Sequence, residues 1–170
     1  MNNKVITITG PTGSGKSTVS YALAKKLGHC VCIEVDHIKH MIISGFYKQD
    51  GNWQYSEWRL VGETLGIVAN NFLNRDFDVV IAGYLQSEAW EELEKQVIIS
   101  HKILLNPSKE VIKIRDSGRD PKYYMGEKAI QEHIDYISKS GILKGFTKVD
   151  SSELTVDETV EKIINIISLS

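Results

Sequence analysis

The chain has 170 residues and a mass of 19.1 kDa, which suits one ordinary domain and is short for two. Hydrophobic residues make up 42% of the sequence and charged residues 25%, which excludes an intrinsically disordered chain. Twenty basic residues against 22 acidic ones leave a formal net charge of −2, which argues against a broad basic surface for nucleic acid or an anionic membrane.

Neither a membrane span nor a secretory signal is indicated. The longest apolar runs, such as residues 79–82, are far below the roughly 20 residues that cross a bilayer. Residues 1–9 lack the length and the cleavage pattern of a signal peptide. Cys30 and Cys32 stand two apart in an apolar stretch, and one such pair offers no framework of disulfides. We therefore expect reduced thiols and a cytoplasmic protein.

Short β-branched runs alternate along the chain with longer segments of helical periodicity. The predicted strands cover residues 5–9, 31–35, 79–82, 103–105 and 146–149. The first three predicted helices cover residues 17–27, 37–43 and 56–72. Two more are predicted to begin at Ser87 and at Asn106, and the last two include residues 130–137 and 156–167. No repeat, low-complexity segment or proline-rich linker divides the chain, so residues 1–170 are predicted to form a single domain.

Several of these helices have a recognisable N-terminal signal. Ser56 is the predicted N-cap of the third helix, and Asn106 followed by Pro107 marks the start of the fifth. Thr155 and Glu158 are spaced as a capping box ahead of the last helix.

Strands that alternate with helices favour parallel pairing and right-handed crossovers, which gives a three-layer α/β fold with helices on both faces of the sheet. In such sheets ligands bind beyond the carboxyl ends of the strands. Candidate functional residues are therefore those that follow Thr9, Val35, Ala82, Leu105 and Val149.

The strongest motif follows the first predicted strand: residues 10–17 read GPTGSGKS and match G-x-x-x-x-G-K-[ST], with a helix after them. Glycines let backbone N–H groups surround phosphate oxygens, and the positive end of the helix adds to the attraction. Lys16 is expected to reach the β- and γ-phosphates, and the Ser17 hydroxyl to bind Mg²⁺. The predicted nucleotide-binding residues are Gly10, Thr12, Gly13, Ser14, Gly15, Lys16, Ser17 and Thr18. A dinucleotide fingerprint is excluded because Thr18 stands where G-x-G-x-x-G requires its third glycine.

Two acids, Glu34 and Asp36, stand at the end of the second predicted strand and would point the same way because strand side chains alternate. A kinase needs a carboxylate to orient the attacking hydroxyl and accept its proton, and carboxylate oxygens near Mg²⁺. The third predicted strand ends at Ala82 without an acid, so Asp36 is the best-placed catalytic carboxylate. Alternatively, Asp36 caps the helix that follows it. Glu34 is a candidate for the metal site, with a salt bridge as the alternative.

Arg115 and Arg119 stand four residues apart in the fifth predicted helix and would share a face. Residues 116–126 are predicted to break the helix and form a short lid. Guanidinium groups on a mobile cover grip phosphate oxygens, stabilise the charge that spreads in phosphoryl transfer, and stack on an adenine ring. Taken alone, the pair also fits a solvated helix end whose cations complement the helix dipole.

The order of these features, GPTGSGKS, a strand that ends in an acid, then R-x-x-x-R before a short lid, resembles the small P-loop kinases. That group includes shikimate and gluconate kinases, chloramphenicol phosphotransferase and the zeta-toxin-like kinases, and the segment IEVDHIKHMI is most similar to uncharacterised bacterial ATP-binding proteins of the last kind. The resemblance implies a five-stranded parallel sheet in the order 2-3-1-4-5, with ATP and Mg²⁺ as the donor. It implies Asp36 at the acceptor hydroxyl, Arg119 near the phosphates, and Arg115 near adenine, which residues 150–154 would approach. Shikimate kinases have two aspartates where this chain has Glu34 and Asp36, which argues against a shikimate acceptor.

Residues 37–75 are predicted to bind the phosphoryl acceptor. Their basic residues, apart from histidine, are Lys39, Lys48, Arg59 and Arg75. This set lacks the arginine cluster that usually grips a dianionic nucleotide acceptor. Aromatic residues are denser: Phe46, Tyr47, Trp53, Tyr55 and Trp58. These rings either line a pocket for an uncharged or ring-bearing hydroxyl compound or pack as ordinary core, and His37 and His40 are alternative metal ligands without further support.

We therefore expect an ATP-dependent phosphotransferase that moves the γ-phosphoryl group to a hydroxyl of a small molecule, with Lys16, Asp36 and Arg119 as catalytic residues. A nucleoside or nucleotide kinase is the alternative among enzymes, and a nucleotide-dependent binding module or slow NTPase is the alternative outside them. The expected partner is the small-molecule acceptor, with neither nucleic acid nor membrane, and the expected assembly is a monomer or a homodimer.

Overall fold

The computed structural model describes residues 3–44, 55–121, 124–139 and 144–169. They form a sheet of five parallel strands in the order β2-β3-β1-β4-β5. The strands are β1 (Val5–Thr9), β2 (Cys30–Glu34), β3 (Asp78–Ala82), β4 (His101–Leu105) and β5 (Thr147–Val149). The parallel pairing predicted from the alternation, and the strand order implied by the resemblance, are both confirmed.

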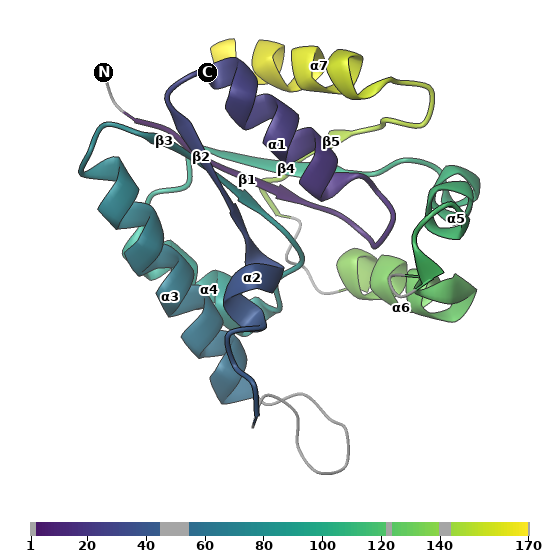
Figure 1. Cartoon of the computed structure of the whole chain (residues 1–170), viewed down its shortest axis with the longest axis horizontal. Helices are drawn as coiled ribbons and strands as arrows, with labels where there is room; N and C mark the ends of the chain where they lie inside the picture. The colour runs from purple at the N-terminus through teal and green to yellow at the C-terminus, as the bar shows by residue number, and fades with distance from the viewer. Residues whose placement is uncertain (1–2, 45–54, 122–123, 140–143, 170) are drawn as a thin grey trace.

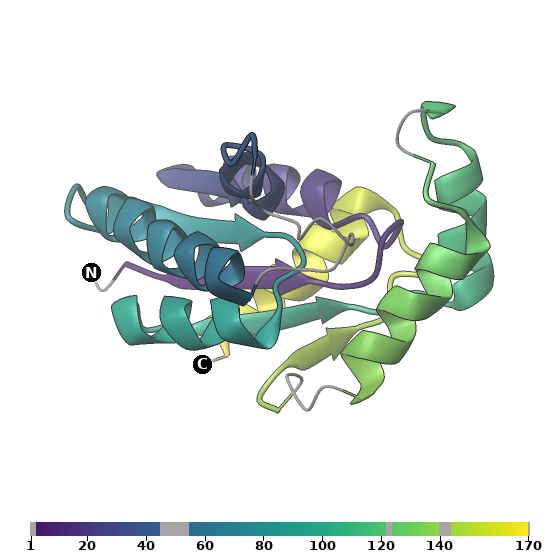
Figure 2. The ribbon, with the colours of Figure 1, turned by 90° about the horizontal axis from the view of Figure 1, so that it is seen from below.

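Helices cover both faces and one end of this sheet. The described helices are α1 (Lys16–Leu27), α2 (Val35–Lys39), α3 (Tyr55–Leu73), α4 (Ser87–Gln96), α5 (Lys109–Ser117), α6 (Gly126–Lys139) and α7 (Val156–Ser168). Figure 1 shows α1 and α7 on one face and α3 and α4 on the other, which gives three layers. Helices α5 and α6 lie at the end toward which the strands point (Figure 2), where ligands bind in folds of this kind.

The central strand β1 contributes to the core on both faces of the sheet. Val5 packs in the cluster under α3 and α4, whereas Ile6 and Ile8 pack in the cluster under α1 and α7. Every residue of β1 is buried. Because β1 is held by two neighbouring strands and two helical layers, the loop that leaves Thr9 starts from a fixed point.

Helices α3 and α4 approach closely because a glycine stands at their contact. A Cβ atom on Gly62 would lie 2.2 Å from the carbonyl oxygen of Ala89, so no larger residue fits there without a shift. Nearby, Arg59 of α3 donates a hydrogen bond to Glu92 of α4 at 3.0 Å. The two helices therefore form one close-packed wall beside β2 and β3.

The boundary between β2 and α2 differs from the prediction. Strand β2 ends at Glu34, and α2 begins at Val35 and ends at Lys39 instead of covering residues 37–43. Glu34 pairs with Ala82, the last residue of β3, so no ladder partner remains for Val35. Val35 is fully buried and lies against Gly83, where a Cβ atom would come within 2.5 Å of the Val35 Cβ. Loss of the ladder partner and this close contact turn the chain into the helix.

Two predicted helix starts are also wrong by one or two residues. Ser108 caps α5, its hydroxyl accepting from the N–H of Val111 at 3.3 Å. Asn106 instead extends the pairing of β4 with β5, because its N–H donates to the carbonyl of Val149. Helix α3 already includes the residue before Ser56. The capping box of Thr155 and Glu158 at the start of α7 is confirmed.

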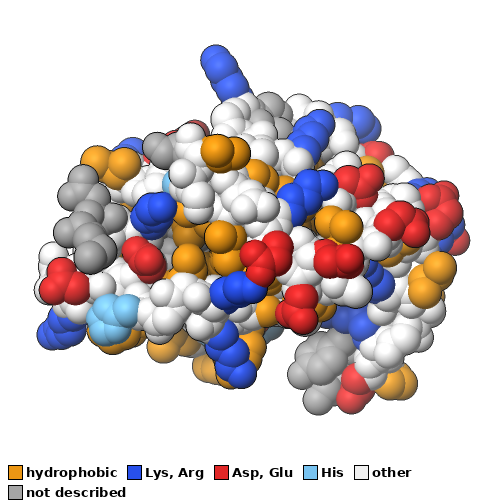
Figure 3. Space-filling view, turned by 90° about the horizontal axis from the view of Figure 1, so that it is seen from above, with side chains coloured by type: hydrophobic (Ala, Val, Ile, Leu, Met, Phe, Trp, Pro, Cys, Tyr) orange, Lys and Arg blue, Asp and Glu red, His pale blue; other side chains and the backbone are white. Residues whose placement is uncertain are grey.

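The charged side chains and the two cysteines are distributed as follows. On the face seen in Figure 3, Lys and Arg side chains are interspersed with Asp and Glu side chains. Cys30 and Cys32 are free thiols and only partly buried. Among the residues described, none of the helices has the length and apolar character needed to cross a bilayer.

Candidate functional site

The phosphate loop joins β1 to α1 at the carboxyl end of the sheet. The N–H of Ser14 donates to the carbonyl of Pro11 at 3.2 Å and closes a turn. Gly15, the N-cap of α1, has φ of 94°, a left-handed conformation that favours glycine, and supplies no side-chain cap. The N–H groups in the first turn of α1 and the positive end of its dipole can therefore bind phosphate oxygens.

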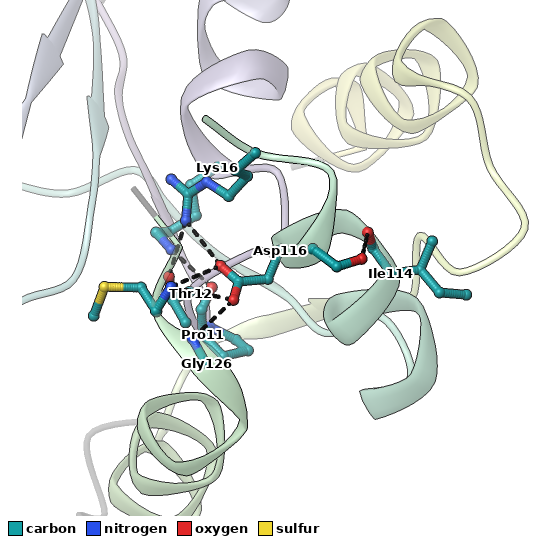
Figure 4. A network of polar contacts seen from close by, with 9 residues as sticks. Pro11, Thr12, Lys16, Ile114, Asp116 and Gly126 are labelled. Carbon is teal, nitrogen blue, oxygen red and sulfur yellow. Dashed lines mark hydrogen bonds and ion pairs between the residues drawn. The ribbon is translucent and has the colours of Figure 1, made fainter. Parts of the chain in front are cut away.

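Lys16 lies at the base of this loop. Its ammonium Nζ donates to the carbonyl of Pro11 at 2.8 Å (Figure 4). Burial lowers the pKa of Lys16 to about 8, while Asp36 acts to raise it and Arg119 to lower it. The two other predicted catalytic residues are thus close enough to influence the charge of this ammonium.

Ser17 and Glu34 come together across the gap between α1 and β2. The Ser17 hydroxyl donates to Oε2 of Glu34 at 3.3 Å. A hydroxyl and a carboxylate are the hard oxygen ligands that Mg²⁺ prefers. No group of three or more His, Cys, Asp or Glu side chains that could hold a metal occurs in the described part of the chain, His37 and His40 included. A bound Mg²⁺ would therefore rely on phosphate oxygens and water for its other ligands.

Asp36 lies in the first turn of α2 and not on a strand. The N-cap of α2 is Glu34, so the alternative that Asp36 caps this helix is wrong. Its carboxylate pairs with Nζ of Lys39 at 3.1 Å. Burial acts to raise the pKa of Asp36, but Lys39, His40 and Lys16 outweigh that effect and hold the pKa below its ordinary value. Asp36 is therefore an ionised carboxylate at neutral pH, as a proton acceptor must be.

Arg115 joins the phosphate loop to the loop that follows β5. One guanidinium nitrogen donates to the carbonyl of Ser14 at 3.3 Å, and the other donates to the carbonyl of Ser151 at 2.8 Å. Ser151 is 2% exposed. The segment 150–154 therefore lies against the phosphate loop, with Arg115 between them.

Arg119 lies beyond the end of α5, because the helix ends at Ser117 and Gly118 is its C-cap. The expectation that Arg119 shares a helix face with Arg115 is therefore wrong, although both side chains reach the phosphate loop. Arg119 donates to Oγ1 of Thr12 at 3.3 Å and to Oδ1 of Asp116 at 3.4 Å.

Asp116 is a residue of this site to which the sequence analysis assigned no role. It is completely buried and accepts hydrogen bonds from the N–H groups of Met125 at 3.2 Å and Gly126 at 3.0 Å. Figure 4 shows it between the phosphate loop and the start of α6. Asp116 thus fixes Arg119 and the first turn of α6 at once. The signal available in the sequence was an acid placed between two arginines, ahead of a glycine.

A second group missed by the sequence analysis is the ring cluster, formed by Tyr84, His133 and Tyr136. The Tyr84 and His133 rings are stacked, with centroids 5.0 Å apart and planes 10° apart, and the Tyr84 and Tyr136 centroids are 5.3 Å apart. Tyr84 follows β3, whereas His133 and Tyr136 belong to α6. The ring cluster therefore joins α6 to the carboxyl end of the sheet.

Of the aromatic residues predicted to line an acceptor pocket, the structure describes the side chain of Trp58. Trp58 is 1% exposed and belongs to the core under α3 and α4, so the packing alternative holds for it. The remaining predictions, Phe46, Tyr47, Lys48, Trp53 and the side chain of Tyr55, lie outside the described residues.

Comparison with protein families gives one match that covers most of the chain. The family model described as AAA domain matches residues 5–140. This range includes the phosphate loop, Asp36, both arginines and the ring cluster. A search of the curated proteins gave no match.

Solved structures share the whole architecture. A tunicamycin resistance protein from Deinococcus radiodurans superposes with a TM-score of 0.71 at 16% identity, covering 99% of this chain and 97% of that one. A shikimate kinase from Acinetobacter baumannii gives 0.66 at 22% identity, with 98% and 94% covered, and a gluconokinase from Sinorhizobium meliloti 1021 gives 0.66 at 20% identity, with 99% and 93% covered. At these identities the likeness shows the fold, which is that of the small P-loop kinases.

Proposed function

Because the chain belongs to the AAA domain family and has the fold of small P-loop kinases, we propose that it is a phosphotransferase. It moves the γ-phosphoryl group of ATP to a hydroxyl group of a small molecule. The observation that carries the proposal is that Asp36, in the first turn after β2, and Arg119, which contacts Thr12 of the phosphate loop, both lie close enough to Lys16 to influence its charge. A phosphoryl group held at Lys16 would lie between a proton acceptor and a guanidinium, the arrangement that transfer to a hydroxyl requires.

The donor nucleotide is bound by the phosphate loop and its neighbours. Backbone N–H groups of the phosphate loop and of the first turn of α1 surround the phosphates, and Lys16 exchanges its bond to the Pro11 carbonyl for phosphate oxygens. The guanidinium of Arg115, held by Ser14 and Ser151, offers a planar cation to the base.

Mg²⁺ fits the oxygen pair formed by Ser17 and Glu34, which would hold it against the phosphates. When bound, the ion neutralises charge on the β- and γ-phosphates. The structure supports this assignment through the donor chemistry of that pair. No described group offers a competing set of three protein ligands.

Asp36 and Arg119 act on the transfer itself. The Asp36 carboxylate orients the acceptor hydroxyl and takes its proton as the acceptor oxygen bonds to the γ-phosphorus. The bond from that phosphorus to the β–γ bridging oxygen breaks, and ADP leaves with the electron pair. Arg119 stabilises the charge on the transferring group, and its contacts to Thr12 and Asp116 hold it there before the reaction begins.

The proposal is tested by ADP release from ATP and Mg²⁺ in the presence of a panel of hydroxyl compounds, measured above the ATPase background. Asp36→Asn should bind ATP as the unmodified protein does and lose transfer by about 10²–10⁴-fold, because it removes the proton acceptor. Asp76→Asn is the matched control. Asp76 has a left-handed φ that asparagine tolerates, and it precedes the amino end of β3, whereas Asp36 lies at the carboxyl end of the sheet. Lys16→Ala should weaken both ATP binding and transfer. Full transfer by Asp36→Asn, or water as the sole acceptor, would contradict the proposal.

A further inference from the structure

The ring cluster holds α6 in a defined position over the active-site end of the sheet. Tyr136 accepts a hydrogen bond from the N–H of Ser87 at 3.2 Å, and the centroid of its ring lies 5.3 Å from that of Tyr84. Behind Tyr84, the Trp58 ring packs edge-on at 6.3 Å and belongs to the core. His133 stacks on Tyr84, so its ring is supported by residues that are themselves fixed.

A chain of contacts joins His133 to Asp36. Asp36 pairs with Lys39 at 3.1 Å, and the Lys39 Nζ lies 5.9 Å from the centroid of the Trp58 ring. Trp58 in turn packs against Tyr84, on which His133 stacks. His133 therefore lies at the same end of the sheet as Asp36, on a helix that the sequence analysis did not connect with the acceptor. Burial lowers its pKa, which favours the neutral imidazole.

One nitrogen of His133 lacks a partner. Its Nδ1 is buried and makes no hydrogen bond with any residue that the structure describes. A buried polar atom without a partner costs free energy, and such atoms are rare unless a ligand or water completes them. A neutral imidazole offers one donor and one acceptor nitrogen, which suits a hydroxyl or an amide and not a phosphate dianion.

Two cationic side chains of segment 37–75 at this end of the sheet are paired with carboxylates. Arg59 donates to Glu92 at 3.0 Å, and Lys39 pairs with Asp36 at 3.1 Å. These pairs weaken the attraction of the two cations for a second phosphate group.

We propose that the His133–Tyr84 stack is an acceptor subsite, and that it selects an uncharged, ring-bearing alcohol that hydrogen-bonds to Nδ1 of His133. The proposal rests on the phosphotransferase function above and names the class of its acceptor. A polar group of the acceptor lies in the plane of the imidazole and completes its buried Nδ1, while the acceptor ring packs beside the stack. A hydroxyl of the acceptor then extends toward Asp36.

The variant His133→Phe tests this directly. Phenylalanine keeps a ring against Tyr84 and removes both nitrogens. Because Nδ1 has no partner among the described residues, its loss should not lower the unfolding midpoint. The matched control is His29→Phe: His29 also stacks on a ring, that of Phe77 at 3.8 Å, but it lies at the amino end of β2. This control separates loss of a stacked imidazole from loss of the subsite.

The assay uses nucleosides, hexoses and aryl-substituted diols, each paired with its phosphate monoester. Transfer is measured by ADP release, and binding is measured separately by calorimetry with a non-hydrolysable ATP analogue and Mg²⁺ present. We expect an uncharged member to be preferred over its phosphate ester. His133→Phe should raise the acceptor KM and Kd about tenfold and leave the KM for ATP within twofold, whereas His29→Phe should change neither.

The binding arm separates this proposal from the phosphotransferase function. An uncharged ligand that binds but receives no phosphoryl group, and whose affinity His133→Phe reduces, supports the subsite and contradicts transfer. Preference for the phosphate esters, absence of binding by any uncharged member, or an unchanged acceptor Kd in His133→Phe overturns the subsite even when transfer occurs.

Discussion

Replacing Asp116 by asparagine removes the charge that joins the end of α5 to the start of α6. The carboxylate is fully buried and accepts from Met125, Gly126 and Arg119 at 3.0–3.4 Å. Asparagine keeps one acceptor oxygen and turns an NH₂ group toward N–H donors. Hydrogen bonds to a charged group contribute about 1.5–3 kcal/mol each, and a carboxylate at a helix N-terminus adds about 0.3–1 kcal/mol. Since one acceptor is retained, we expect a loss of about 2–4 kcal/mol.

Urea unfolding followed by circular dichroism, without nucleotide, measures this loss. With a slope of about 2 kcal/mol per molar urea, the midpoint should fall by about 1–2 M. The control is Ser117→Ala at the neighbouring position, where an exposed hydroxyl donates only to the carbonyl of Ile114. That variant should lie within about 0.5 kcal/mol of the unmodified protein. If Asp116→Asn unfolds at the same urea concentration as Ser117→Ala, the carboxylate does not anchor α6, and the role assigned to it is wrong.

Three further predictions follow from particular contacts. Bound phosphates should raise the pKa of Lys16 from about 8, so ATP binding should take up protons and the affinity for ATP should fall as the pH rises above about 8. Calorimetry at several pH values would detect this fall, and Lys16→Arg should remove the dependence of ATP affinity on pH. Gly62→Ala should lower the free energy of unfolding by about 1–2 kcal/mol, since overpacking against Ala89 costs about 1–3 kcal/mol and helix propensity offsets at most about 1 kcal/mol. Thr155→Ala removes the capping bond to Glu158 and should cost about 1 kcal/mol in the same unfolding experiment. An ATP affinity independent of pH, or unfolding midpoints unchanged in the two variants, would contradict the corresponding structural argument.

The phosphate loop could be predicted because its motif is contiguous and its flanking elements are recognisable in the sequence. Strand and helix types were also predictable, since burial on one or both faces imposes a period that the side chains show. The end of β2 was not, because it depends on where β3 ends: Glu34 pairs with the last residue of that strand, and no local property of Val35 reveals it.

The contacts of the ring cluster and of Asp116 could not be predicted for a related reason. Tyr84 and His133 are far apart in the sequence and meet only after α6 has packed over the sheet. Asp116 looked like one more charge in a polar stretch, and its burial depends on the return of the chain at Gly126. Short-range periodicity carries no information on such pairs, so the donor side of the site was the more predictable half.

Under the proposed function, helix α6 supports both the donor and the acceptor. Its first residue, Gly126, is tied through Asp116 to the side chain that faces the donor, and His133 follows seven residues later, about 10 Å along the axis at 1.5 Å per residue. Two turns of hydrogen-bonded helix do not bend easily, so any movement that ATP imposes at Gly126 is transmitted to the imidazole. Occupancy by one substrate should therefore alter the affinity for the other, by equal factors in both directions.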